Sequence, residues 1–198
     1  MSEGSSAAEV SGLRSHAGAN QTSCQLWFPW HEPETAHTHI VDGDGWWSQL
    51  TPLFVNTFRA VLGCDEDEAR SLSALVRPAY VDLRGWSVFD DTFKCLEGLR
   101  CEGWRHVILS NHVPELPAIV DGLGLTAYID RIFNSAETSY EKPHRQAFHQ
   151  VIEYCGAAWM IGDNPVADVR GAQAAGMNAL LVGADNRSLQ DVLRLFKG

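Results

Sequence analysis

Hydrophobic side chains recur at helical spacing in the first strongly patterned stretch of the chain. Residues 46–62 carry large apolar side chains three or four positions apart and are followed by Gly63, which predicts an amphipathic helix. Four acidic residues, Asp65 to Glu68, then occupy the first turn of a second helix, which we expect to end before Pro78. The pattern therefore predicts a small all-helical unit over residues 46–83.

From Phe89 onward the pattern alternates between helices and short apolar strands. The expected helices cover residues 92–100, 114–123, 143–154, 165–173 and 188–196. The expected strands cover residues 106–109, 131–133, 159–161 and 179–182. This alternation predicts an α/β fold with a parallel, Rossmann-like sheet and helices on its faces. Ligands of such sheets bind beyond the carboxyl ends of the strands.

The amino-terminal segment lacks such a pattern. Residues 1–26 are rich in Ser, Gly, Ala and Asn, a composition typical of disordered or loosely structured segments. We therefore divide the chain into this segment, a helical subdomain over residues 27–85, and an α/β core over residues 86–198.

Two polar stretches before the first helix have alternative interpretations. His31, His37 and His39 are spaced as metal ligands can be, but the prolines among them favour an irregular loop. Asp42 and Asp44 resemble the start of a calcium loop, yet the closing glutamate of that motif is missing. A turn with a helix-capping aspartate is therefore favoured at residues 42–45.

Composition narrows the classes of partner. The chain has 15 Lys and Arg against 25 Asp and Glu, so its net charge is −10, which argues against nucleic acid or an anionic membrane surface. No apolar run approaches the roughly 18 residues that span a bilayer, and the start of the chain lacks the apolar part of a signal peptide. We expect a cytoplasmic protein. The five cysteines form no CxxC pair and suggest neither zinc nor a disulfide framework.

The most informative stretch is Trp159 to Asp168, which reads WMIGDNPVAD. The strand should stop at Gly162, so Asp163 follows its carboxyl end. Asn164 is a suitable N-cap and Pro165 fits the first helical position, which places Asp168 one turn inside a helix. The two carboxylates can then lie together as hard oxygen ligands for Mg²⁺. The alternative is a loop aspartate and a solvated helix aspartate.

Two further polar groups are expected at the same edge of the sheet. Ser110 ends a strand, and its hydroxyl with the amides of Asn111 and His112 could hold a phosphoryl oxygen if a helix starts there. Lys142, directly before Pro143, adds a cation at a second helix start. Taken singly, Lys142 is better interpreted as a surface lysine before a proline, and Ser110 as an ordinary serine at a strand end. Their shared position makes a binding site the better interpretation.

These residues carry a resemblance to a known family. The segments VILSNH, YEKPH and MIGDNPVADVRGAQAAG resemble motifs II, III and IV of the haloacid dehalogenase (HAD) superfamily, which consists largely of phosphatases and dehalogenases. The resemblance covers residues 86–185. It implies that the preceding helical unit is the small cap domain of this superfamily.

The resemblance also implies roles for individual residues. Ser110 would bind the phosphoryl oxygen, Lys142 would offset negative charge, and Asp163 with Asp168 would hold Mg²⁺. The implied activity is Mg²⁺-dependent hydrolysis of a small-molecule organic phosphate through an aspartyl-phosphate. The alternatives are a 2-haloacid dehalogenase, or a non-catalytic remnant that binds phosphate or metal.

The sequence departs from the family pattern at motif I, a hydrophobic strand that ends in Asp-x-Asp and supplies the nucleophile. The pairs Asp42 with Asp44 and Asp90 with Asp91 are poor matches, one before and one after the helical unit. We therefore expect either a gap between the strands that end at Ser110 and Asp163, which only the run 24–28 could fill, or direct pairing of these two strands, which would displace the site. The nucleophile stays unknown, and impaired activity is expected, as in a chain whose amino-terminal segment is missing.

Overall fold

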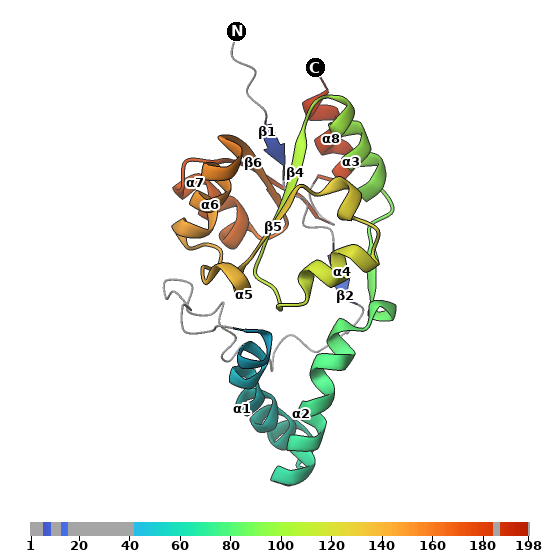
Figure 1. Cartoon of the computed structure of the whole chain (residues 1–198), viewed down its shortest axis with the longest axis vertical. Helices are drawn as coiled ribbons and strands as arrows, with labels where there is room; N and C mark the ends of the chain where they lie inside the picture. Colours follow the sequence, from blue (N-terminus) through green and yellow to red (C-terminus); the bar gives the residue numbers. More distant parts are fainter. Residues whose placement is uncertain (1–5, 9–12, 16–41, 184–186, 198) are drawn as a thin grey trace.

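The computed structural model describes residues 6–8, 13–15, 42–183 and 187–197, with side chains from residue 42 onward. These residues form an α/β core and a helical hairpin that projects from one end of it (Figure 1). This arrangement confirms the predicted fold class.

The core is built on a five-stranded sheet with the strand order β5, β4, β1, β6, β7. Each neighbouring pair in this order runs parallel. The strands are β1 (Ser6–Ala8), β4 (Arg105–Ser110), β5 (Arg131–Asn134), β6 (Ala157–Gly162) and β7 (Asn178–Leu181).

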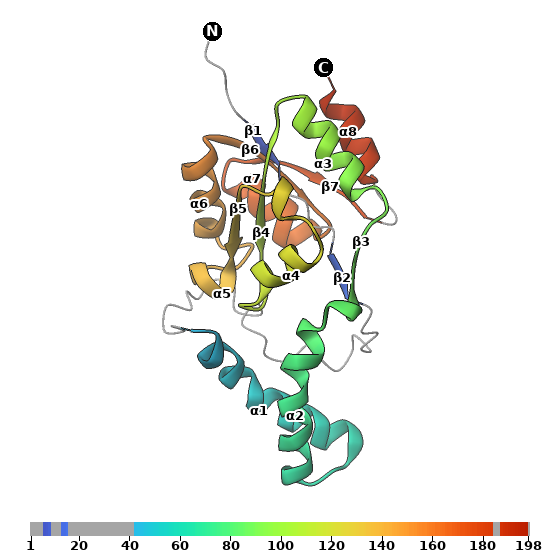
Figure 2. The same cartoon turned by 45° about the vertical axis from the view of Figure 1, so that its right-hand side comes forward.

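Helices cover both faces of the sheet, so that the core has three layers (Figure 2). In β4, Val107 and Leu109 point into one apolar cluster and Ile108 into the other, as expected for a strand buried on both sides. One cluster packs under α3 (Thr92–Cys101), α4 (Leu116–Gly122) and α8 (Leu189–Phe196). The other packs under α6 (Arg145–Cys155) and α7 (Gly171–Ala174).

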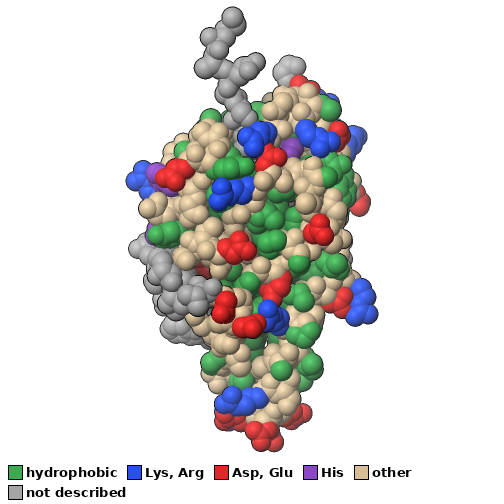
Figure 3. All heavy atoms as spheres, in the orientation of Figure 1, with side chains coloured by type: hydrophobic (Ala, Val, Ile, Leu, Met, Phe, Trp, Pro, Cys, Tyr) green, Lys and Arg blue, Asp and Glu red, His purple; other side chains and the backbone are tan. Residues whose placement is uncertain are grey.

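The hairpin consists of α1 (Gly43–Leu62) and α2 (Glu66–Val81). Asp42 caps α1, which confirms the capping turn, and Gly63 ends it with a positive φ of 69°. The second helix runs past Pro78 to Val81, so its predicted end before Pro78 is wrong. Acidic side chains gather at the far end of the hairpin, where α2 begins (Figure 3).

An aromatic cluster joins the hairpin to the core. Trp46, Trp47 and Leu50 of α1 are buried against Val113 and Ile119 of the core, with Trp86 between the two parts. The connecting segment contains the 3-10 turn η2 (Leu83–Gly85) and β3 (Trp86–Val88), which pairs antiparallel with β2 (Leu13–Ser15). The remaining short elements are η3 (Thr126–Tyr128), α5 (Ser135–Thr138) and the π-helical turn η4 (Pro165–Arg170).

The centre of the sheet differs from the prediction. Strand β1 lies between β4 and β6, with Ala7 opposite both Arg105 and Ala158, so the gap is filled, the two strands do not pair directly, and both predicted alternatives are wrong. The expectation of a loosely structured segment 1–26 also fails at β1 and β2. The sequence Ser-Ala-Ala has no bulky apolar residue to signal a strand, and the backbone bonds of two neighbours hold it instead. The run 24–28 and the candidate metal ligands His31, His37 and His39 lie outside the described residues.

None of the described helices combines the length and the apolar character that crossing a membrane requires.

Candidate functional site

The carboxyl ends of the parallel strands share one edge of the sheet, and this edge faces the hairpin (Figure 1). The loop that follows β4 touches the hairpin directly: Val113 packs in the aromatic cluster, and a Cβ on Gly43 of α1 would lie 3.4 Å from Pro114. The loops after β4, β5 and β6 carry the predicted site residues.

The loop after β6 folds as its sequence predicts. The side chain of Asn164 caps the following helix, where its Oδ1 accepts from the backbone amides of Val166 and Ala167, each at 2.9 Å. Asp168 turns back from this helix, and its Oδ2 accepts from the amide of Asn164 at 2.8 Å. A Cβ on Gly162 would overlap the Asp168 carboxylate, so only glycine allows this loop to close.

The other oxygen of Asp168 bonds to Lys142. Its Oδ1 lies 2.8 Å from Nζ of Lys142, and the two side chains are only 4% and 8% exposed. Both carboxylate oxygens of Asp168 therefore have partners within the protein. Lys142 thus lies beside one of the two predicted carboxylates, and the ion pair that it makes with Asp168 was not part of the prediction.

Asn111 contacts the main chain of Lys142 rather than standing open at the edge. Its Nδ2 donates to the Lys142 carbonyl at 2.9 Å, and its Oδ1 accepts from the Lys142 amide at 2.7 Å. Ser110, which precedes it, is half-buried at the last paired position of β4, opposite Asn134 of β5.

The loop after β4 is longer than predicted. Helix α4 begins at Leu116, so the amides of Asn111 and His112 do not form a helix start and gain no support from a helix dipole. Asn134 holds the loop instead, because its Nδ2 donates to the Val113 carbonyl at 2.7 Å. The helix predicted to begin at Pro143 also begins later: α6 begins at Arg145, and His144 is its N-cap.

His112 lies among aromatic rings at the junction with the hairpin. Its ring centroid is 5.8 Å from that of Tyr80 and 5.4 Å from that of Trp86. Burial lowers the pKa of His112 to about 4, so the imidazole is neutral at pH 7. Its Nδ1 is buried without a hydrogen-bond partner among the described residues.

Asp163 is the accessible carboxylate of the site. It is exposed directly after β6, and no described residue bonds to its side chain. Within the described ranges no cluster of three His, Cys, Asp or Glu side chains could hold a metal. Mg²⁺, however, commonly takes one or two protein carboxylates and completes its shell with water and phosphate oxygens, so Asp163 fits that ion.

Three of the four aspartates considered as nucleophiles have other partners, and no hydrogen bond or ion pair of the described residues links the fourth, Asp90, to the edge of the sheet. Asp42 Oδ1 accepts from the amide of Gly45 at 2.6 Å, and Asp44 pairs with Arg77 at 2.6 Å. Asp91 precedes α3 and accepts from the amide of Gln190 at 3.3 Å. None of these three directly follows a strand of the sheet.

Two acidic residues near the site had no signal in the sequence. Glu141 is 3% exposed, and burial raises the pKa of its carboxyl to about 7. Its Oε2 finds no hydrogen-bond donor among the described residues. Glu115 joins the core to the hairpin, where it accepts from Trp47 Nε1 at 3.1 Å and from Arg77 Nε at 2.7 Å. Both depend on contacts between distant segments, which hydrophobic periodicity does not report.

Comparisons with known proteins identify the family of this chain. The family model of haloacid dehalogenase-like hydrolases matches residues 11–176. A curated relative, haloacid dehalogenase-like hydrolase domain-containing protein 3 of Mus musculus, is 26% identical over 75% of this chain and 59% of its own. Phosphoserine phosphatase of Thermus thermophilus is 30% identical over 66% of this chain and 55% of its own.

Among solved structures, a HAD phosphatase from Thermococcus onnurineus superposes with a TM-score of 0.57 at 23% identity, covering 75% of this chain and 89% of that one. This likeness concerns the fold. The chain spans about six-tenths of the length of the first curated relatives it matches. Because the family model covers well over half of the sequence, the chain belongs to the haloacid dehalogenase-like hydrolase family.

Proposed function

We propose that this chain is a phosphatase-type HAD protein that binds small organic phosphates together with Mg²⁺ at the edge of the sheet facing the hairpin. The buried pair of Lys142 and Asp168 carries the proposal, because it places a fixed cation beside the loops that hold Ser110 and Asp163. The phosphatase names of several relatives support a phosphate substrate. The hairpin serves as the cap over this edge, and we expect the protein in the cytoplasm.

Each residue has a role that follows from its surroundings. Ser110 would donate its hydroxyl to a phosphoryl oxygen, with the amides of Asn111 and His112 nearby. Lys142 would offset the charge of the bound phosphate. Asp163 would hold Mg²⁺, which draws electron density from a phosphoryl oxygen. Asp168 was predicted as a second metal ligand, but we now propose that it orients Lys142, since its two oxygens are already bonded.

We expect the chain to bind a phosphate substrate but to hydrolyse it slowly. In this family an aspartate attacks phosphorus and the resulting aspartyl-phosphate is then hydrolysed. The sequence after β1 reads Glu9-Val10-Ser11, which lies outside the described residues and supplies no Asp-x-Asp. Another aspartate would have to take the place of this nucleophile. A displacement of its carboxylate by about an ångström lowers the rate by roughly two orders of magnitude, so hydrolysis should be slow.

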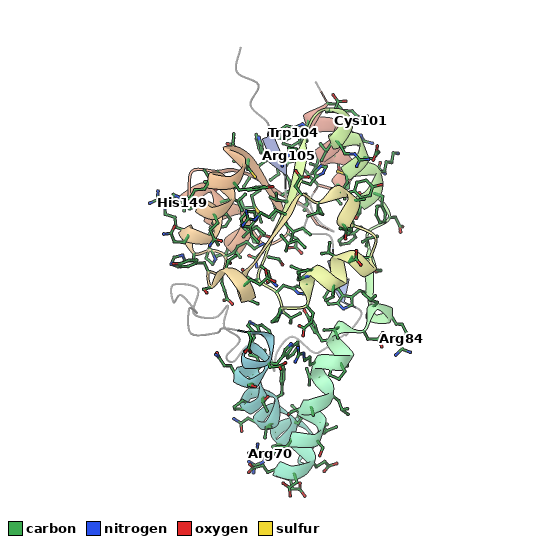
Figure 4. All side chains as sticks on the ribbon, viewed as in Figure 1. Arg70, Arg84, Cys101, Trp104, Arg105 and His149 are labelled. Carbon is green, nitrogen blue, oxygen red and sulfur yellow. The ribbon has the colours of Figure 1, made fainter. Side chains whose placement is uncertain are left out.

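Calorimetric titration with orthophosphate and Mg²⁺ tests the proposal. Phosphate should bind the full chain only when Mg²⁺ is present, and Asp163→Asn should abolish that Mg²⁺ dependence. Arg70→Ala, at the far end of the hairpin, should bind as the unmodified chain does (Figure 4). Absence of phosphate binding with Mg²⁺ would overturn the proposal.

Two activity assays separate the remaining alternatives. Rapid Mg²⁺-dependent hydrolysis of an aryl phosphate, lost in Asp163→Asn, would contradict the expected impairment. Chloride release from a 2-haloacid without Mg²⁺ would favour a dehalogenase, since that reaction needs no phosphate site.

A further inference from the structure

We infer that Asn111 is a positioning residue for Lys142, and that its side chain acts through this lysine rather than on the substrate. This inference rests on the proposed phosphate site for its functional meaning. The contact itself rests on the two hydrogen bonds between the Asn111 amide and the Lys142 backbone.

The side chain of Asn111 continues the sheet where its backbone pairing stops. Ser110 and Asn134 are the last paired residues of β4 and β5. One residue later, the Asn111 amide presents a donor and an acceptor to Lys142, 31 residues away, in the same way as a peptide group of a strand. The loop after β5 is thereby tied to the end of β4 at Lys142.

This contact fixes the base of the Lys142 side chain while Asp168 fixes its tip. Asn111 holds the backbone amide and carbonyl, and the ammonium group bonds to Asp168. Asp168 is held in turn by the amide of Asn164, after β6. Since β1 lies between β4 and β6, these contacts span the sheet edge across its central strand.

Fixing both ends matters because lysine is a flexible residue. A lysine side chain has four rotatable bonds and loses much conformational entropy when it is ordered. If the backbone at Lys142 could move, its ammonium group would reach Asp168 or the phosphate only at further entropic cost. Asn111 removes that freedom before the substrate binds.

A neighbouring asparagine provides a matched comparison. Asn134 also ends a strand and is fully buried, and its Nδ2 donates to a loop carbonyl at 2.7 Å. That carbonyl belongs to Val113, and no described hydrogen bond joins Asn134 to Lys142. A variant at Asn134 therefore perturbs the loop after β4 while leaving the contact to Lys142 in place.

The first experiment measures hydrogen exchange at the Lys142 backbone amide of the full chain by NMR. Asn111→Ala should accelerate this exchange at least tenfold, while amides within the pairing of β4 and β5 keep their rates. Asn134→Ser should leave the Lys142 amide protected, and Asn111→Ser serves if the alanine variant does not fold. An unchanged exchange rate at Lys142 in a folded Asn111 variant would overturn the inference. This readout needs no ligand.

The second experiment is a double-mutant cycle on orthophosphate affinity with Mg²⁺. If Asn111 acts through Lys142, Asn111→Ala should weaken binding about tenfold alone, and should add almost nothing in the Lys142→Met background. Additive losses would mean that Asn111 contacts phosphate directly, contrary to the inference. If the unmodified chain binds no phosphate, the proposed function fails, while the exchange experiment still decides whether Asn111 holds Lys142.

Discussion

Two ion pairs of similar geometry join distant parts of this protein, and they differ in burial. Lys142 and Asp168 lie 2.8 Å apart with side chains 8% and 4% exposed. Arg77 of the hairpin and Glu115 of the core lie 2.7 Å apart, with exposures of 40% and 21%. The first pair is within the candidate site, and the second holds the hairpin against the loop that follows β4.

The difference in burial implies different costs of breaking each pair. Removing one member of a buried pair leaves a charge without compensation in a medium of low polarity. When an ion pair near the surface is broken, water solvates the remaining charge, and salt already weakens the pair. Its loss therefore lowers the free energy of unfolding only slightly. We therefore expect the buried pair to stabilise the site strongly and the Arg77 pair to contribute little at the junction, where the buried aromatic cluster joins the hairpin to the core.

The largest expected effect comes from breaking the buried pair. Among the described residues, Lys142→Met leaves the Asp168 carboxylate with the amide of Asn164 as its one partner, which should lower the free energy of unfolding by about 3–5 kcal/mol. The double variant Lys142→Met with Asp168→Asn should recover part of this loss, because it also removes the charge of the Asp168 carboxylate. Urea unfolding of the three proteins at pH 7 measures both effects. A loss below about 1 kcal/mol in Lys142→Met would show that burial does not decide the cost.

Glu141 extends the comparison to a buried acid that has no charged partner in the part of the chain that the structure describes. Its pKa rises from an ordinary 4.5 to about 7 on folding, so the folded protein keeps a proton that the unfolded chain releases. The contribution of Glu141 to the free energy of unfolding therefore falls as pH rises from 4.5 to 7, by up to about 3 kcal/mol, and stays reduced above pH 7. Glu141→Gln should thus stabilise the protein at pH 8 and change little at pH 4.5.

Urea unfolding at both pH values tests this prediction, with the difference between variant and unmodified protein as the measured quantity. Other titrating groups cancel in that difference. Equal stabilisation at both pH values would indicate better packing by the amide rather than removal of a buried charge.

Local sequence patterns predict one part of this structure, and contacts between distant residues determine the rest. The helical hairpin, the parallel sheet and the capped helix start at Asn164 follow from local patterns, and the structure confirms them. Strand β1 escaped prediction because two neighbouring strands hold it, whereas its own residues are small. The partners of Asn111 and Glu115 are 31 and 38 residues away, and no local pattern specifies them.

The smallest effect is expected at the junction with the hairpin. Arg77→Ala removes the contacts to Glu115 and Asp44 but leaves Glu115 bonded to Trp47. We expect a loss of about 1 kcal/mol or less, which should disappear at 1 M NaCl as salt screens the pair. Hydrogen exchange should accelerate at the Trp47 indole and in the first turns of α1, with the strands of the core unaffected.

Arg70 supplies the matched control for the hairpin pair. It forms an ion pair with Glu66, four residues earlier in the same helix, at the end of the hairpin farthest from the core (Figure 4). Arg70→Ala should alter neither unfolding nor exchange at Trp47, because this contact joins no separate parts of the molecule. If Arg77→Ala instead cost as much as Lys142→Met, the hairpin would be held as firmly as the site itself.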